Sequence, residues 1–559
     1  MKLNKLNILV LIILLAAFLR FWKLGSAPIS VNWDEASLGY NSYSVLKSGR
    51  DEWGNLLPAI FPAFGDYKLP VYVYSSILPI FFFGLNNFST RFVSALAGTF
   101  TILAVYLLTN QLQKSQKTKL SLGVFNLGHI TALITALLPW HFFLSRPALE
   151  ASLGLSLFTF GLYFLIHSLE KRQSLVLAAS FWALSIHTYN SYRVLVPLFG
   201  IIFLVFYFKQ IFKIDKYLVW SALITILASI ILLYQMFTGQ GLARYDKLKI
   251  LNQNTIFQIG ENRSRSQLPS TVSRLIYNRP VYFVTTVLKN HISYFGFSFW
   301  NQTNGAQTQF AIPKYNLVTY PLLVLLVLGI IYLSKYSKNK LVAIFLIYFF
   351  LSPIAASITN SPPQAIRPSP MIPFVVLFSG YGLVWLSKIM AKKTEAVVCV
   401  FLFVYLLCTL MYLKHYWTSY LFEYSSSWQY GYNQVFDYIN KNGHSYQNIF
   451  ITKKYGEPHI FDLFYNKINP NVIQSEDQTI RFSKSDWLWT DKIKNHYYVN
   501  DWQIPVSSIV NLKLESGITV SAGNSLLITS PDHIPSNSII LKVVNFLDGQ
   551  PAFIITKVP

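Results

Sequence analysis

Long apolar segments dominate the first three quarters of the chain and predict membrane-spanning helices. A helix needs about 20 mainly apolar residues to cross a bilayer. Segments close to this length recur up to residue 413 and are separated by polar connections. They predict eleven spans, at residues 6–22, 91–110, 122–144, 153–169, 174–189, 194–208, 217–237, 317–334, 341–358, 371–387 and 395–413. This pattern is typical of an all-α polytopic membrane protein.

Two connections, residues 23–90 and 238–316, are too long to be turns. In the first, apolar positions recur at helical spacing from Asp34 to Lys47, and Gly49 is placed to end that helix. The segment Val71–Leu85 is apolar and aromatic but short, and Pro79 interrupts it. We expect it to form an interfacial or re-entrant helix.

The last part of the chain, residues 414–559, has a different pattern. Short strand-like pieces (IFIT, SLLIT, AFIIT) replace the long apolar runs, and residues 428–441 have helical periodicity. These features predict a small α/β domain. The expected organisation is therefore a transmembrane domain at 1–413, with outer loops 23–90 and 238–316, followed by an α/β domain at 414–559.

Composition and charge support this organisation and orient it. The chain is 53% hydrophobic and 12% charged, where a soluble protein carries about a quarter charged residues. Its net charge of +23 arises entirely before residue 414. The basic residues gather in alternate short connections, including Lys114, Lys117 and Lys119, and Lys388, Lys392 and Lys393. Such connections remain on the cytoplasmic side, so the charge orients a membrane protein and does not indicate nucleic acid as a partner.

This topology predicts an integral protein of the plasma (inner) membrane with a cytoplasmic N-terminus and an extracytoplasmic C-terminal domain. The two cysteines, Cys399 and Cys408, lie in one apolar run, which favours neither a disulfide framework nor a thiolate metal site. The histidines show no ligand spacing. We expect no essential cofactor, with a divalent metal kept as the alternative.

The candidate chemistry lies at the outer ends of the predicted spans. Carboxylates at a membrane surface are costly to retain without a task. If the outer loops converge, they form a pocket with carboxylates on one side and cations on the other. The candidates are Asp34, Glu35, Asp66, Tyr67, Lys68, Arg146, Glu150, Tyr189, Arg193 and Arg367. Transfer from a lipid phosphate suits this set, because cations stabilise a phosphate leaving group and a carboxylate accepts a proton from the attacking hydroxyl.

Each candidate also has a structural interpretation. Asp34 suits a helix N-cap. Asp51 and Glu52 are interpreted as solvated loop charges. Arg146 and Glu150, four residues apart, suit a helical ion pair. Arg91 and Arg193, at span ends, suit anchors whose charged tips reach the membrane surface.

Four motifs in order along the chain resemble a known group of enzymes. They are Trp33-Asp34-Glu35 in the first outer loop, DYKLPVYVY around Lys68, SRPALEAS around Arg146 and Glu150, and QAIRPSPMIPF around Arg367. Together they resemble the polytopic glycosyltransferases of family 39 and their relatives, which include the protein O-mannosyltransferases and the lipid A aminoarabinose transferase. The resemblance covers roughly residues 1–413. Here a tyrosine separates Asp66 from Lys68, only one proline follows, and Glu150 stands where relatives often have Asp.

The resemblance implies the C-type membrane fold and a mannosyltransferase-like activity in the cell envelope, such as protein glycosylation. It implies a polyprenyl-phosphate sugar donor embedded among membrane lipids, and an extracytoplasmic protein, lipid or glycan acceptor. Transfer would invert the sugar, with Asp34 as base supported by Glu35. Lys68, Arg146 and Arg367 would bind the donor phosphate. Glu150 would contact the acceptor or the sugar. From their place at the outer ends of the predicted spans, we also expect Asp66, Tyr67, Tyr189 and Arg193 to contact substrate.

Two other function classes fit parts of the pattern. A transporter or flippase of lipid-linked saccharide would also need many spans, but transporters place charges and broken helices near the middle of the membrane. Here the charges lie at outer ends. An outer-face scaffold would use the membrane part only as an anchor, for which eleven spans are far more than necessary.

Overall fold

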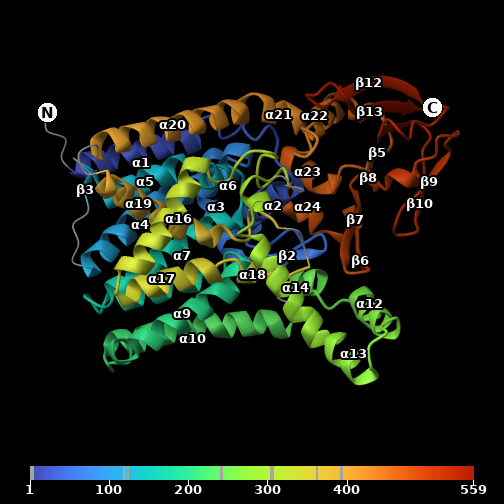
Figure 1. The fold of residues 1–559 in the computed structure, drawn as a ribbon. Coiled ribbons are helices and arrows are strands. Elements are labelled where there is room, and N and C mark those ends of the chain that lie inside the picture. The colour runs from blue at the N-terminus through green and yellow to red at the C-terminus, as the bar shows by residue number, and fades with distance from the viewer. Residues whose placement is uncertain are drawn as a thin grey trace. The chain divides into compact units, whose positions relative to one another are not determined.

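The computed structural model describes residues 5–116, 121–122, 125–238, 243–302, 307–360, 363–390 and 394–559 (Figure 1). The chain divides into two compact units. We call residues 1–20, 94–145 and 150–413 the membrane unit, and residues 21–93, 146–149 and 414–559 the sheet unit. The sheet unit therefore includes the first outer loop, which the sequence analysis grouped with the transmembrane domain.

Helix occupies most of each predicted span in the described part of the chain. Seven segments in the described part of the chain are at least 18 residues long and apolar enough to cross a membrane, so the protein is an integral membrane protein. The helices at the predicted spans are α1 (Lys5–Phe21), α4 (Asn87–Ser115), α5 (Leu127–Leu137), α6 (Pro139–Leu144), α7 (Glu150–His167), α8 (Ser174–Ile186), α9 (Asn190–Ile211), α10 (Lys216–Phe237), α16 (Tyr320–Tyr336), α17 (Lys340–Leu351), α18 (Ile354–Ser357), α19 (Ile372–Ile389) and α20 (Thr394–Trp417).

The membrane unit differs from the prediction at one span. The first residues of the predicted span 122–144 form a short strand pair, β3 (Ser121–Leu122) with β4 (Phe125–Asn126), and helix begins only at Leu127. Asn126 caps that helix by accepting the backbone N–H of His129 at 2.8 Å. Four basic residues used to orient the chain, Lys117, Lys119, Lys392 and Lys393, lie outside the described residues.

Helices α16 and α19 approach each other closely because glycine faces backbone on both sides. A Cβ atom on Gly329 would overlap the carbonyl oxygen of Phe378, and one on Gly382 would overlap that of Leu325. Small residues permit this approach between membrane helices, where packing replaces the hydrophobic driving force. The loop 238–316 contains helices α11 (Ala243–Leu248), α12 (Gln253–Ser264), α13 (Ser270–Ile276), α14 (Arg279–Ser293) and α15 (Phe297–Trp300).

The sheet unit is built on a seven-stranded sheet in the order β12-β13-β11-β5-β8-β7-β6. The central strand β5 runs parallel to β11 and β8, and the remaining pairs are antiparallel. The predicted strands IFIT and SLLIT are β5 and β11, and AFIIT lies within β13. The strands are β5 (Ile449–Thr452), β6 (Thr479–Lys484), β7 (Trp487–Ile493), β8 (His496–Val499), β11 (Ser525–Thr529), β12 (Ile539–Asn545) and β13 (Pro551–Val558), with β9 (Asn511–Lys513) and β10 (Thr519–Ser521) paired separately.

The first outer loop folds into the hydrophobic core of this unit. It forms α2 (Trp33–Ser48), the hairpin β1 (Phe61–Ala63) and β2 (Asp66–Lys68), and α3 (Pro70–Phe83). Its Ala36 and Tyr40 are fully buried in one cluster with residues of α22 (Tyr432–Asn442) and α23 (Pro458–Tyr465). The helix predicted from Asp34 to Lys47 is confirmed, and Gly49 ends it at a left-handed φ of 69°. The remaining short helices are α21 (Ser419–Glu423) and α24 (Pro470–Ile473).

The interpretation of Asp51 and Glu52 as solvated charges is wrong. The residues are 0% and 2% exposed. Asp51 accepts the backbone N–H groups of Trp53 and Asn55, and Glu52 forms an ion pair with Arg481 at 3.1 Å. Burial raises the pKa of both carboxyls. The sequence could not show this, because the partner cation lies more than 400 residues away.

Another buried carboxylate, that of Asp462 of α23, joins that helix to β8. It accepts hydrogen bonds from His496 Nδ1 and Tyr498 Oη, both at 2.6 Å. Burial alone would raise the pKa of Asp462, but the charge and hydrogen bond of His496 outweigh it and hold the pKa below the ordinary 3.8. Burial likewise opposes protonation of His496, but Asp462 holds that pKa above 6.5.

The ion pair between Asp462 and His496 therefore stabilises the sheet unit most at pH values between the ordinary pKa of aspartate, 3.8, and that of histidine, 6.5. The raised pKa of His496 contributes stability that is fully present below pH 6.5 and is lost as the pH rises through the pKa of the folded state. The lowered pKa of Asp462 contributes stability that is present above pH 3.8 and is lost as the pH falls through the pKa of the folded state.

We expect His496→Gln to lower the unfolding free energy by about 1–3 kcal/mol near pH 5.5, and by less near pH 8.5. Thermal unfolding of the purified chain at both pH values measures this. Replacement of the exposed His444 by Gln is the control, and an equal loss at both pH values would contradict the assignment.

Candidate functional site

Helix α2 begins with a capping box that does not use Asp34. Asn32 is the N-cap and accepts the backbone N–H of Glu35 at 2.9 Å, while Glu35 Oε2 accepts the backbone N–H of Asn32 at 3.2 Å. This arrangement satisfies two backbone donors at the helix start. The interpretation of Asp34 as the helix cap is therefore wrong. The carboxylate of Asp34 takes no part in the helix cap.

That carboxylate forms an ion pair with Lys68 at the end of β2. The Asp34 side chain is 41% exposed and that of Lys68 is 9% exposed, so the acid is half open while the ammonium is nearly buried. Residues 34 and 68 meet because the β1–β2 hairpin folds back beside the start of α2. Asp66 lies on the same hairpin and accepts the backbone N–H of Tyr67 at 2.8 Å. Asp34, Asp66, Tyr67 and Lys68 thus lie on neighbouring elements of the sheet unit.

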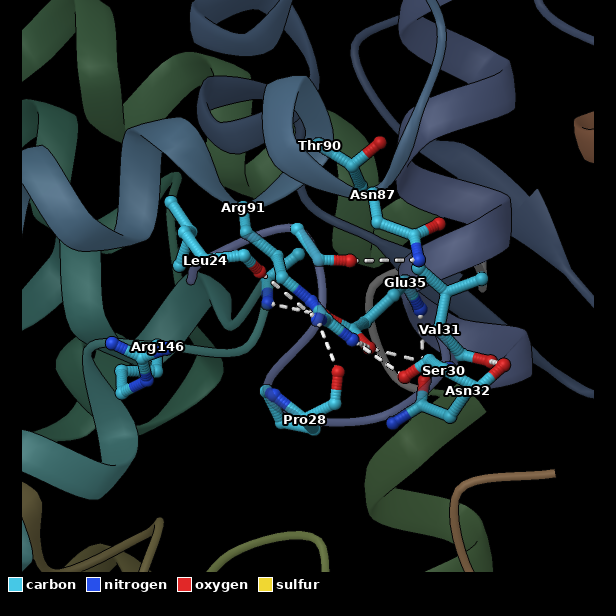
Figure 2. A network of polar contacts seen from close by, with 12 residues as sticks. Leu24, Pro28, Ser30, Val31, Asn32, Glu35, Asn87, Thr90, Arg91 and Arg146 are labelled. Atoms are coloured by element: carbon cyan, nitrogen blue, oxygen red, sulfur yellow. Dashed lines mark hydrogen bonds and ion pairs between the residues drawn. The ribbon is translucent and has the colours of Figure 1, made fainter. Parts of the chain in front are cut away.

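Glu35, next to Asp34, is held inside the unit by Arg91 of α4. The two fully buried side chains form a bidentate pair, with Nε–Oε1 at 2.8 Å and Nη2–Oε2 at 2.9 Å. Arg91 also donates to the carbonyls of Leu24, Pro28 and Ser30 (Figure 2). Glu35 Oε1 accepts the backbone N–H of Ala148 at 2.7 Å. Glu35 therefore positions the start of α2, and Arg91 is a buried partner and not the membrane-surface anchor that its span-end position suggested.

Arg146 has a comparable structural environment. Its side chain is fully buried and its Nη2 donates to the carbonyls of Trp22 and Ala27, both at 2.8 Å. Its Nε donates to Tyr416 Oη at 3.1 Å. Helix α7 begins only at Glu150, so Arg146 precedes the helix and the two residues do not lie one turn apart on it, as the helical ion pair would require. This location favours a structural role for Arg146 over the expected phosphate contact.

The tip of the hairpin is held by aromatic rings from the C-terminal region. Phe64, with φ at 59°, stacks between Trp33 at 5.5 Å and Trp487 at 6.4 Å, measured between ring centroids. Its carbonyl accepts the backbone N–H of Leu488 at 2.7 Å. The backbone N–H of Trp33 donates to Gln429 at 2.8 Å. The α/β region therefore fixes both elements that carry the Asp34–Lys68 pair.

The membrane unit holds a second group of predicted residues around a cavity of about 280 Å³. Tyr189 and Arg193 line it from the start of α9, and Arg367 lines it from the segment before α19. Arg193 is hydrogen-bonded to Gln235 of α10, and Arg367 Nη1 donates to Thr359 Oγ1 at 2.9 Å. The other walls are mainly apolar, and include Leu232, Met236 and Leu248. Two guanidinium groups in an apolar cavity suit an anionic group attached to a lipid.

Glu150, the remaining predicted site residue, is the first residue of α7, and the cavity lining does not include it. The sequence reasoning did not select Phe64, Trp487 or Gln429. The glycine at position 65, directly after Phe64, gave one weak signal, since glycine is common in hairpin loops. Within the described ranges, no three His, Cys, Asp or Glu side chains lie close enough together to hold a metal ion.

Comparison with solved structures identifies the fold of this chain. No family model matches the chain, and no curated protein is significantly similar in sequence. Among solved structures, the chain is similar to ArnT from Cupriavidus metallidurans bound to undecaprenyl phosphate, with 11% identity, a TM-score of 0.55, and 99% of this chain and 98% of that chain covered. The apo state of the same protein gives 12% identity and a TM-score of 0.54 over 98% and 97% of the two chains.

A third structure, the oligosaccharyltransferase AglB from Archaeoglobus fulgidus with an inhibitory peptide and a dolichol-phosphate, has 13% identity and a TM-score of 0.48 over 94% and 69% of the chains, a similarity too low to support an argument. The ArnT similarity covers almost the whole of both chains. The predicted C-type glycosyltransferase fold, followed by a C-terminal sheet region, is therefore confirmed.

The aromatic contacts of Phe64 predict that this side chain keeps the hairpin closed. Removing a buried ring costs about 3–5 kcal/mol, so we expect Phe64→Ala to speed amide hydrogen exchange in residues 61–68 by about tenfold or more. Hydrogen-exchange mass spectrometry of the full chain measures this. Phe64→Tyr keeps the stack and should restore protection, and Leu57→Ala, at a side chain 63% exposed, is the control. Unchanged exchange in Phe64→Ala would contradict this role.

Proposed function

We propose that the protein transfers a sugar from a polyprenyl-phosphate donor to an acceptor on the extracytoplasmic face of the membrane. The observation that carries this proposal is the half-open Asp34 carboxylate paired with Lys68, on a fold shared with ArnT. One ArnT structure contains undecaprenyl phosphate, a lipid phosphate of the class proposed here. The proposal keeps the orientation expected from the basic connections, with the N-terminus in the cytoplasm and the C-terminal region outside.

Asp34 is the proposed base. Its carboxylate accepts the proton of an acceptor hydroxyl as the hydroxyl oxygen forms a bond to C1 of the sugar. The bond from C1 to the phosphate oxygen breaks at the same time, and polyprenyl phosphate leaves with the electron pair. Attack from the face opposite the phosphate inverts the configuration at C1. Exposure of Asp34 gives the acceptor access, and the network of Glu35 and Arg91 fixes the helix turn that carries it.

Lys68 of the sheet unit is proposed to bind the donor phosphate, and the arginines of the membrane-unit cavity are proposed separately as an anion site for a lipid phosphate. Before the donor binds, the Lys68 ammonium is paired with Asp34, which makes Asp34 a weaker base. A lipid phosphate that attracts Lys68 would reduce this pairing and so raise the basicity of Asp34. Arg367 and Arg193 supply two further positive charges in the membrane unit, and Tyr189 supplies an aromatic wall. We propose a hexose such as mannose as the sugar, and a protein, lipid or glycan as the acceptor.

Asp34 and Lys68 should affect different steps of the reaction. We expect Asp34→Asn to lower kcat by about 100-fold to 10,000-fold, as for the loss of a general base, with donor affinity retained. We expect Lys68→Met to weaken binding of polyprenyl phosphate by about 10-fold to 100-fold, because it removes a charge-assisted hydrogen bond. The assay follows radiolabel from polyprenyl-phosphate mannose into acceptors from an extracytoplasmic extract, and calorimetry measures lipid-phosphate binding.

Replacement of the exposed Asp437 by Asn provides the matched control for these variants. Near-normal turnover of Asp34→Asn would remove Asp34 from the role of base. Unchanged affinity in Lys68→Met would remove Lys68 from the phosphate site. Movement of the labelled donor across liposomes without any labelled product would support the flippase alternative.

Protein cations, and not a metal ion, are proposed to stabilise the leaving phosphate. Lys68 supplies positive charge of the kind that such a leaving group requires. We expect turnover to change by less than about twofold after EDTA treatment and removal of the chelate, since no metal-bound water or Lewis acid enters the proposed step. Loss of activity that returns when Mg²⁺ or Mn²⁺ is added would overturn this expectation.

A further inference from the structure

The second outer loop has an unusually one-sided charge. No acidic residue occurs between Glu261 and Glu395 in the sequence. Within this interval, Arg274, Arg279 and Lys289 lie on or beside helices α13 and α14, and all three are exposed. Arg263 and Arg265 are engaged locally, with the carbonyl of Tyr277 and with Glu261 respectively. The exposed surface of α13 and α14 is therefore positively charged, and neither helix contains an acidic residue that would neutralise this charge.

Helix α13 exposes an apolar stripe. Val272, Leu275 and Ile276 recur at helical spacing and are 39%, 71% and 45% exposed. Ser273, about 100° round the helix from Val272, is buried and donates to the carbonyl of Arg263 at 3.2 Å. Large apolar side chains thus face outward while a small polar one faces the protein, the reverse of a helix that lies in water.

Helix α14 repeats this arrangement over its whole length. Val281, Val284, Leu288 and Ile292 fall on one side and are 36%, 53%, 55% and 68% exposed. Asn290, on the other side of the helix, attaches it to the membrane unit by donating to the carbonyl of Ser357 at 3.2 Å, and His291 Nε2 is hydrogen-bonded to the carbonyl of Phe350 at 2.8 Å. The helix is therefore fixed in place with its apolar side turned outward.

This attachment connects α14 to the cavity of the membrane unit. Asn290 Nδ2 donates to the carbonyls of Ser357 and Thr359, at 3.2 and 3.1 Å. Thr359 in turn accepts the hydrogen bond of Arg367, which lines the cavity. The amphipathic helix and a proposed donor-binding arginine thus share one short segment of chain.

We propose that α13 and α14 form a platform that lies in the outer leaflet of the membrane and binds anionic lipids beside this cavity. Exposed apolar stripes flanked by arginine and lysine are the features of a helix that lies in the interface plane, with its apolar side among acyl chains and its cations at lipid phosphates. Charge complementarity identifies the occupant as an anionic lipid surface, since this interval has no carboxylates to repel it. The platform deepens the proposed function, because it would concentrate lipid phosphates, including the donor, near Arg367.

The position of α14 in the bilayer is tested with a fluorescent label and needs no turnover. Cys399→Ser and Cys408→Ser remove both native cysteines. Leu288→Cys then carries an environment-sensitive NBD label in the full chain, reconstituted in bilayers. We expect blue-shifted emission, strong quenching by brominated lipid tails and little quenching by iodide. Lys513→Cys, at an exposed position of β9, is the water-exposed control. Equal access of iodide to both labels would overturn the proposal and indicate a face for another protein.

The charge part is tested by the lipid that the protein retains. Protein is purified from an equimolar mixture of phosphatidylcholine and phosphatidylglycerol, and the bound lipids are quantified by mass spectrometry. We expect the combined variant Arg274→Gln, Arg279→Gln, Lys289→Gln to lower the ratio of anionic to zwitterionic lipid by about threefold or more. Replacing Lys513, Lys542 and Lys557 by Gln is the matched control. An unchanged ratio in the test variant would overturn anionic-lipid binding.

These experiments distinguish a failure of the lipid-binding proposal from a failure of the sugar-transfer proposal. Both lipid measurements are independent of sugar transfer, so loss of the platform leaves the role of Asp34 to its own assay. If the platform binds lipid phosphates, inorganic phosphate at the same concentration should not displace the retained lipid, because it lacks the tails that the apolar stripes hold. Displacement by inorganic phosphate alone would show a soluble-anion site and would overturn the lipid assignment.

Discussion

The buried ion pair between Arg91 and Glu35 is the interaction on which the candidate site depends. A guanidinium and a carboxylate without water are costly unless their remaining hydrogen-bonding groups are also satisfied. Here three loop carbonyls take up the remaining donors of Arg91, and two backbone N–H groups bind Glu35. The network therefore stabilises one conformation of residues 24–35. Asp34 is presented at the end of this segment, one residue from the buried acid.

The adjacent carboxylates of Asp34 and Glu35 have opposite environments, so that one holds the local structure and the other is open to a substrate. Glu35 is enclosed and paired, whereas Asp34 is 41% exposed and borders Lys68. The alternation arises because successive side chains on a helix point about 100° apart, so one faces the core and the next faces outward. The proposed proton transfer rests on this half-open acid beside a nearly buried ammonium.

The C-terminal region is part of the apparatus that holds this pair. The first outer loop contributes Ala36 and Tyr40 to its hydrophobic core, and Phe64 stacks between Trp33 and Trp487. A hairpin of two three-residue strands is marginal by itself. The aromatic contacts and the bond from Leu488 compensate for this weakness. A sheet region with no site residue of its own thereby determines where Lys68 lies.

The sequence alone determined the class, the helical segments and the order of the motifs, because apolar length, charge asymmetry and helical period are local properties. It also selected Asp34 and Lys68 from motif and position. Only the tertiary structure decided which carboxylates are buried and which are open. Glu52 pairs with Arg481, and Arg146 is enclosed by loop carbonyls, through contacts more than 100 residues apart in sequence. A short motif does not reveal such partners, because the burial of its residues depends on which distant segments of the chain pack against it.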